Sequence, residues 1–267
     1  MKTLYTAGYS DELIQDLASR TAASHAAFFF PRLRPGMDLL DCGCGPGTIT
    51  LDFAKTVAPA MVVGIDIEPR QIEAAKYIAA DRKISNVQFQ VASIFDLPFP
   101  DASFEAVFAH AVLEHQKKPL NALKEMHRVL KPGGIIGVRD ADHGGILLMP
   151  SDPTIEHSIE LWERLWAHNG GDPKLGRRHK MLLRETGFTR IEASASYDYC
   201  GTTESANGFS QLMAHEFSEA GASRQLLDLG WADRSDLYKI TTAWKLWGEN
   251  PDSFFARPRC EAVGWKK

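Results

Sequence analysis

The chain has 267 residues, of which 44% are hydrophobic, and this is enough apolar surface for a substantial core. Its 30 basic and 34 acidic residues give a formal net charge of −4. Because nucleic-acid binding depends largely on neutralising phosphates with a basic surplus, this balance argues against a nucleic-acid partner. The length fits one α/β domain with an elaboration better than two independent domains.

The spacing of the cysteines predicts neither a disulfide framework nor a zinc site with four ligands. The four are Cys42, Cys44, Cys200 and Cys260. The N-terminus lacks the basic start and apolar run of a secretory signal, and no stretch approaches the ~20 apolar residues that span a bilayer. We therefore expect a cytoplasmic protein with no membrane partner and no bound metal, present as a monomer or homodimer.

Short apolar strands alternate with helices through the first half of the chain. Residues 10–30 favour a helix, which Pro31 and Pro35 end. Strands are predicted at 37–43, 61–66, 87–92, 104–110 and 135–140, and helices at 49–57, 70–81 and 120–130. This alternation is typical of a parallel sheet covered on both faces, in which ligands bind beyond the carboxyl ends of the strands.

The second half is more helical. Apolar residues repeat at helical spacing over 155–166, and a shorter helix is expected at 178–186. Two strands, 189–199 and 254–265, enclose a helical block. We expect an α/β fold with a Rossmann-like, mostly parallel seven-stranded sheet, helices on both faces, and a helical insertion at about 202–250 before the last strand.

The strongest motif is LLDCGCGPGTIT at 39–50, where an apolar strand runs into three glycines. Glycine allows a tight strand-to-helix turn and lets a ligand approach the main chain closely. Asp66 follows at the end of the next strand, where a carboxylate can accept both hydroxyls of a ribose. The motif therefore predicts a nucleoside site at this edge of the sheet.

Two nucleoside cofactors use such a turn. A dinucleotide site requires G-x-G-x-x-G, but Thr48 stands where the third glycine should be. S-adenosylmethionine has no phosphate, and its ammonium can be held by an acid such as Asp41. The pattern favours S-adenosylmethionine over NAD, and a turn that merely joins strand to helix is the alternative.

Residues 37–140 resemble the class I S-adenosylmethionine-dependent methyltransferases, especially the enzymes of ubiquinone and menaquinone biosynthesis. LLDCGCGPG matches the first family motif, VVGIDIEPRQIEAA the second, ASIFDLPFPDASFEAVFAHAVLEH the third and fourth, and EMHRVLKPGG the turn before the fifth strand. YTAGYS and GRRHKMLLRETGF are similar to segments of small-molecule methyltransferases of bacteria and fungi. The resemblance implies one methyltransferase domain over 1–267, with an N-terminal helical cap (1–35), a cofactor-binding core (36–150) and a substrate-side half (151–267).

The resemblance also implies the residues that surround S-adenosylmethionine. The methionine part would be lined by the glycine turn, the ribose held by Asp66, and the adenine covered by Ile67 and met by the backbone of Ile94. Ser93 stands where the family usually has an acid near the adenine amine. The turn residues are Gly43, Cys44, Gly45 and Gly47, and the residues that would border the transferring methyl are Ala109, His110 and Val112, with His115 slightly further on. Tyr9 and Arg20 precede the core and would either fold over the cofactor or pack on the surface.

Three residues are candidates for catalysis. His110 follows the fourth strand and would act as a general base, or else shape the pocket. Asp140 and His143 follow the fifth strand together with Asp142, where they would orient a substrate hydroxyl, form a general base from a paired His and Asp, hold a metal, or only cap a helix and make the loop polar. The sequence therefore predicts methyl transfer to O, N or C of a small, fairly apolar metabolite. The alternatives are a cofactor-binding regulatory or interaction protein without turnover and an NAD-dependent dehydrogenase.

Overall fold

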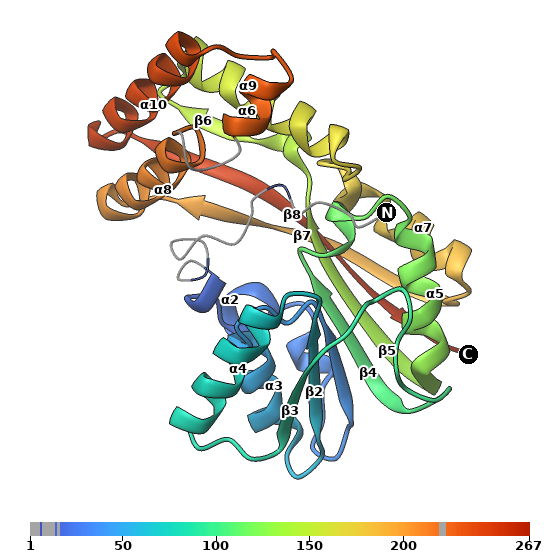
Figure 1. The fold of residues 1–267 in the computed structure, drawn as a ribbon. Coiled ribbons are helices and arrows are strands. Elements are labelled where there is room, and N and C mark those ends of the chain that lie inside the picture. Colours follow the sequence, from blue (N-terminus) through green and yellow to red (C-terminus); the bar gives the residue numbers. More distant parts are fainter. Residues whose placement is uncertain (1–5, 7–13, 15–16, 219–222) are drawn as a thin grey trace.

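The computed structural model describes residues 6, 14, 17–218 and 223–267 (Figure 1). It contains an eight-stranded sheet with the order β3-β2-β1-β4-β5-β8-β6, and β7 also pairs with β8. The strands are β1 (Leu39–Cys42), β2 (Val62–Asp66), β3 (Val87–Val91), β4 (Phe104–His110), β5 (Leu130–Ala141), β6 (Leu147–Met149), β7 (Arg190–Cys200) and β8 (Phe254–Trp265). Among these described strands only β8 runs against the others, which confirms a mostly parallel sheet.

Helices cover both faces of the sheet, as predicted (Figure 1). Successive side chains of a strand point to opposite faces, and β4 illustrates the consequence. Ala106 and Phe108 pack in a core with the helices of one face, whereas Val107 and Ala109 pack in a core with those of the other. The first face carries α2 (Ala22–His25) and α3 (Thr48–Val57), with α4 (Pro69–Asp81) beside α3, and the second carries α5 (Pro119–Val129) and α7 (His179–Thr186).

A third group of helices gathers around β6 and the start of β8, at the other end of the molecule from α3 and α4 (Figure 1). Its members are α6 (Pro153–His168), α8 (Thr203–Glu216), α9 (Ser223–Asp228) and α10 (Arg234–Glu249). They share an aromatic core centred on Trp244, which is fully buried and donates from Nε1 to the Ser158 hydroxyl at 3.0 Å. The last three form the predicted helical insertion before the final strand.

The structure differs from the sequence prediction in three details. The helix expected over 10–30 is interrupted at Arg20 and Thr21, and α2 covers only Ala22–His25. The sheet has eight strands rather than seven, because β6 is too short to produce a periodic pattern. β5 begins at Leu130 rather than 135 and takes in the Lys131–Gly134 segment that was predicted as a turn. None of the helices in the described residues is long and apolar enough to cross a bilayer.

Candidate functional site

The turn after β1 folds back onto β2. The N–H groups of Gly43 and Cys44 both donate to the carbonyl of Ile65, at 2.7 and 2.9 Å. Gly43 has a φ of 76°, and a Cβ atom added there would collide with the side chain of Val112. The glycine turn and the segment after β4 are therefore in direct contact.

The other two glycines of the turn have different surroundings. Gly47 begins α3 with a φ of 79°, and an added Cβ atom would lie 2.7 Å from the ring of Phe89. Gly45 has a φ of 53°, but no atom lies within 4 Å of its added Cβ. Gly47 is thus required for packing, whereas Gly45 faces open space at the edge of the sheet where ligands bind.

Asp66 lies at the end of β2 beside the turn. Its Oδ2 accepts a hydrogen bond from the N–H of Gly45 at 3.0 Å, and its Oδ1 accepts one from the N–H of Glu68 at 2.9 Å. Burial raises the pKa of this carboxyl, and the two N–H groups oppose that rise. The carboxylate is therefore fixed at the rim of the open space in front of Gly45.

Asp41, at the carboxyl end of β1, is almost completely buried. Its Oδ2 accepts a 2.6 Å hydrogen bond from the hydroxyl of Thr50. Burial raises the pKa of the Asp41 carboxyl from 3.8 to about 7, so the group is poised to change charge near neutral pH. A cation bound next to it would lower that pKa again.

The residues expected at the adenine lie next along the same edge. Ile67 is 61% exposed, which is unusual for an isoleucine and leaves an apolar side chain beside Asp66. Ile94 is buried, and the Ser93 hydroxyl accepts a hydrogen bond from the N–H of Phe95 at 3.2 Å. The open turn, the fixed carboxylate and the exposed apolar side chain together fit an adenine nucleoside without phosphate.

His110 ends β4 and contacts Arg139, its partner in register on β5. The His110 Nε2 lies 2.9 Å from Nη1 of Arg139, and because a guanidinium only donates, this nitrogen accepts and Nδ1 carries the proton. Burial, followed by the charges of Arg20 and Arg139, keeps the pKa of His110 well below 6.5. The ring also meets His25 edge to face at 5.2 Å between centroids. His110 is therefore neutral, with its lone pair directed at an arginine.

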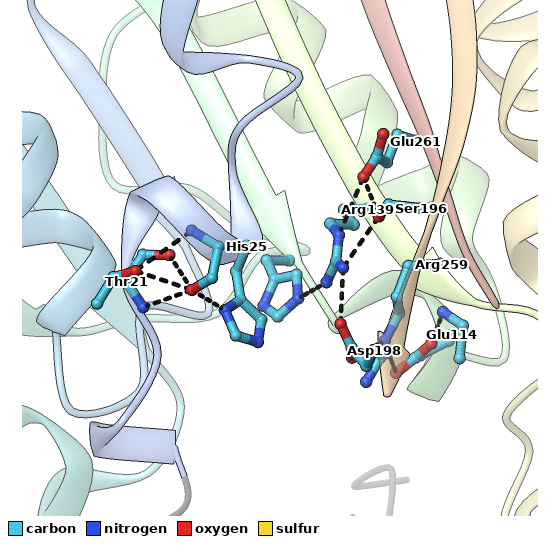
Figure 2. A network of polar contacts seen from close by, with 11 residues as sticks. Thr21, His25, Glu114, Arg139, Ser196, Asp198, Arg259 and Glu261 are labelled. Atoms are coloured by element: carbon cyan, nitrogen blue, oxygen red, sulfur yellow. Dashed lines mark hydrogen bonds and ion pairs between the residues drawn. The ribbon is translucent and has the colours of Figure 1, made fainter. Parts of the chain in front are cut away.

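Arg139 is the centre of a buried polar network (Figure 2). Its guanidinium donates to Asp198 at 2.7 Å, to Glu261 at 3.2 Å and to the Ser196 hydroxyl at 3.2 Å. The other Asp198 oxygen accepts from Nε of Arg259 at 2.6 Å. Burial alone would raise the pKa of Asp198, but Arg259 and Arg139 hold it well below its usual range. Four strands, β4, β5, β7 and β8, are thus tied together at their ligand-binding end.

Asp140 is also fully buried, and its oxygens hold the segment after β4. Its Oδ1 accepts from the N–H groups of Val112 and Glu114, at 3.0 and 3.1 Å, and its Oδ2 lies 3.2 Å from Nε2 of His179. These contacts position the chain between β4 and α5. The side chain of Ala109 is buried on the α5 face of the sheet, so only its backbone is at the ligand-binding edge.

A cavity of about 130 Å³ lies between this segment and the third group of helices. Its walls combine aromatic rings with a small number of charged and imidazole side chains, as ligand sites typically do. The lining includes Trp162, Trp166, Phe209, Trp244 and Phe255 among the rings, and Arg20, Glu114, His115, His143, Glu216, Arg257 and Arg259 among the polar residues. Ala111, directly after His110, also lines it, so the cavity adjoins the end of β4.

His143 is the second buried histidine of the site. Its Nδ1 lies 3.7 Å from Oε1 of Glu163, and its ring meets Trp166 edge to face at 5.1 Å. The Nε2 atom is buried and has no hydrogen-bond partner among the described residues. Burial, then the charges of Arg257 and Arg259, hold the pKa of His143 well below 6.5. The cavity is thus lined by a neutral imidazole whose two ring nitrogens are buried and make no hydrogen bond with the described residues.

The remaining predicted residues have other surroundings. His115 stacks on Trp166, with ring centroids 4.6 Å apart, and lines the cavity rather than the glycine turn. Asp142 caps a short 3₁₀ helix and holds Arg177 at 2.6 Å. Tyr9 lies outside the described residues. No group of three metal-ligating side chains occurs in the part of the chain that the structure describes.

The sequence analysis missed the arginines that β5 and β8 contribute to the site. Arg257 and Arg259 are two positions apart on β8 and therefore face the same side of the sheet. The R-x-R spacing within an otherwise apolar strand was the available signal. Arg139 lay inside a segment that had already been predicted as a strand, but nothing local indicated its partners 57 to 122 residues away.

Comparison with known proteins agrees with this geometry. A family model described as a methyltransferase domain matches residues 33–191, more than half of the chain. A protein of Aspergillus luteorubrus named a probable methyltransferase is 30% identical over 98% of this chain and 97% of its own length. The 27-O-demethylrifamycin SV methyltransferase of Amycolatopsis mediterranei is 37% identical over 48% of this chain and 45% of its own.

The fold is shared with the YcgJ protein of Bacillus subtilis at a TM-score of 0.59, with 18% identity over 90% of this chain and 97% of that one. Nothing in the fold or the comparisons favours a dehydrogenase or a protein without turnover. The chain belongs to the class I S-adenosylmethionine-dependent methyltransferases and is an enzyme that methylates small molecules.

Proposed function

We propose that this enzyme transfers the methyl group to a hydroxyl oxygen of a small aromatic metabolite bound in the cavity beside the end of β4, with His143 as the general base. The observation that carries the proposal is that His143, whose ring nitrogens have no hydrogen-bond partner among the described residues, lines an aromatic cavity. A hydroxyl must lose its proton when its oxygen is methylated, and a neutral imidazole can accept that proton. The name of the Amycolatopsis relative, which refers to methylation of an oxygen, supports the same chemistry.

The two histidines of the site, His110 and His143, have different roles. S-adenosylmethionine supplies a methyl group on a positively charged sulfur, so the chain itself provides alignment and a place for the proton. His143 Nε2 takes the proton of the acceptor hydroxyl, and the carboxylate of Glu163 on its other side stabilises the resulting imidazolium. To accept a proton at Nε2, His110 would first have to break its hydrogen bond to Arg139. It therefore shapes the site and does not act as the base.

The cofactor would be held at the glycine turn. Gly45 leaves room for the methionine part, Gly43 and Gly47 allow the tight turn, and Asp66 offers its carboxylate to the ribose. Ile67 provides an apolar surface for the adenine, and Ile94 lies next to it along the edge. The boundaries of the cap, the core and the substrate-side half remain those proposed from the sequence.

The test compares three histidine variants in a transfer assay with isotopically labelled S-adenosylmethionine and a panel of phenols, catechols and hydroxybenzoates. His143→Gln should lower kcat by about 10²–10⁴ without weakening cofactor binding. His157→Gln is the matched control, because His157 is exposed on α6 and also lies 3.7 Å from a glutamate. Full activity in His143→Gln, or loss of activity only in His110→Gln, would refute the assignment of the base. Absence of transfer to any oxygen in the panel would refute the acceptor.

A further inference from the structure

Strand β8 contributes every second residue over a stretch of five to the cavity wall. Phe255, Arg257 and Arg259 of β8 all line it, since residues two apart share a face of the sheet. Arg259 has its partners within the chain: Asp198 at 2.6 Å and Glu114 at 3.4 Å. Arg257 differs, because it makes no hydrogen bond or ion pair with any described residue, and its Nε is buried without a partner.

The nearest carboxylates cannot satisfy Arg257. Asp198 stands opposite Arg257 in the β7–β8 register, yet one of its oxygens is bound to Arg139 and the other to Arg259. Glu114 is used by Arg259 and by the N–H of Ala141. Burial and the like charge of Arg259 lower the pKa of Arg257 from 12.5 to about 10, so its guanidinium is still charged at neutral pH. The Arg257 side chain is half-buried, but its Nε is fully buried, and buried polar atoms are normally paired.

The charges on the cavity wall also indicate that Arg257 needs an anionic partner. The described lining contains three guanidinium groups, those of Arg20, Arg257 and Arg259, against two carboxylates, those of Glu114 and Glu216. Its two histidines are neutral, since burial lowers the pKa of both His115 and His143. Arg259 is paired with Asp198 and Glu114, so of the two β8 arginines Arg257 is the one without a counter-charge, which a single anionic group on a ligand would supply.

The rest of the lining indicates what carries that anion. Trp162, Trp166 and Trp244, with Phe209 and Phe255, present flat apolar surfaces, and the volume of about 130 Å³ suits a single ring rather than a large ring system. A guanidinium binds a planar carboxylate through two parallel N–H donors. We propose that the acceptor is a hydroxylated aromatic acid, with its carboxylate on Arg257 and its hydroxyl directed at His143. This inference rests on the proposed function and adds the substrate class.

Ligand binding can test this class without turnover. In the presence of saturating S-adenosylhomocysteine, hydroxybenzoates and the corresponding hydroxybenzamides are titrated, and quenching of the cavity tryptophans is followed. The acids should bind roughly 10- to 100-fold more tightly than their amides, as a charge-assisted pair requires. Equal affinity of acid and amide, or binding of neither, would overturn the inference. This comparison uses the unmodified protein and does not depend on any variant folding.

Variants then assign the effect to one residue. Arg257→Met should reduce the affinity for the acids to that for the amides, and Arg257→Lys should lose part of it, because an ammonium keeps the charge but not the two-donor geometry. Arg184→Met, at an exposed position of α7, is the matched control and should change nothing. If Arg257→Met instead weakens S-adenosylhomocysteine binding, Arg257 holds the carboxylate of the cofactor and the inference is wrong.

Failure of the proposed function has a different result. A wild-type protein that binds the acids through Arg257 but does not methylate them would leave the inferred ligand class intact and refute the proposed function. A protein that methylates neutral phenols as efficiently as the acids would leave the proposed function intact and refute the inferred substrate class.

Discussion

Alanine substitutions at two glycines of the turn after β1 should affect different properties. Gly47→Ala should mainly lower stability, and Gly45→Ala should mainly weaken cofactor binding. Gly47→Ala places a methyl group 2.7 Å from Phe89 and 2.9 Å from Ala75 at a φ of 79°. The left-handed backbone costs about 1–2 kcal/mol and overpacking about 1–3 kcal/mol more. The free energy of unfolding should therefore fall by roughly 2–5 kcal/mol, with only a small change in affinity for S-adenosylhomocysteine in the folded protein.

Gly45→Ala carries the backbone penalty alone, because no atom lies within 4 Å of the new methyl group. Its unfolding free energy should fall by only about 1–2 kcal/mol. Its affinity for S-adenosylhomocysteine should fall by about tenfold or more, since the methyl group points into the space proposed for the cofactor. Gly133→Ala is the matched control: its φ is 78° and it has no near neighbour, but it lies at the opposite end of β5 from the site.

The assays are urea unfolding followed by tryptophan fluorescence and calorimetric titration with S-adenosylhomocysteine. The reasoning would be refuted if Gly45→Ala destabilised the protein as much as Gly47→Ala does. It would also be refuted if Gly45→Ala bound the nucleoside as tightly as the wild type or the Gly133→Ala control.

Four further predictions concern the buried charges. Arg139→Met removes the arginine partner of Glu261 and one of the two arginines that bind Asp198, and should lower the unfolding free energy by about 3–5 kcal/mol; a loss below about 1 kcal/mol in urea unfolding would contradict the network. Asp66→Ala should weaken S-adenosylhomocysteine binding by about 1–3 kcal/mol in calorimetry, and an unchanged affinity would rule out its contact with the ribose. Because the pKa of His143 is held below 6.5, its neutral form persists on acidification, so kcat should stay constant as the pH falls through 6.5; a fall centred at or above that pH would argue for another base. Asp41, with a pKa of about 7, should release about half a proton at pH 7 when the ammonium of the cofactor binds; a binding enthalpy independent of the buffer's ionisation enthalpy would show that it does not.

The sequence predicted those parts of the site that depend on local pattern. The glycine turn needs residues adjacent in the chain, and Asp66 needs only a strand of ordinary length before it. The positive φ angles of Gly43, Gly45 and Gly47 and the hydrogen bond from Gly45 to Asp66 agree with that prediction. The order of strands and helices was accessible for the same reason, since hydrophobic periodicity is local.

The polar network could not be predicted, because its members come from distant strands. His110 was singled out as a base from its place after β4, but its lone pair is directed at Arg139, and only the three-dimensional register of β4 and β5 reveals this. Of the roles considered for Asp140, orienting a substrate hydroxyl does not fit the structure, because its Oδ1 accepts hydrogen bonds from the segment after β4. The cavity itself combines residues from the segment after β4, three helices and β8, and no window of sequence contains them together.

The most direct test of the account is a crystal structure of the enzyme with S-adenosylhomocysteine and a hydroxybenzoate. The account predicts that the ribose hydroxyls lie on Asp66, that the sulfur faces the cavity past Ala111, and that the carboxylate and hydroxyl of the acid lie on Arg257 and His143. A nucleoside bound elsewhere, or a sulfur atom separated from the cavity by protein side chains, would contradict it.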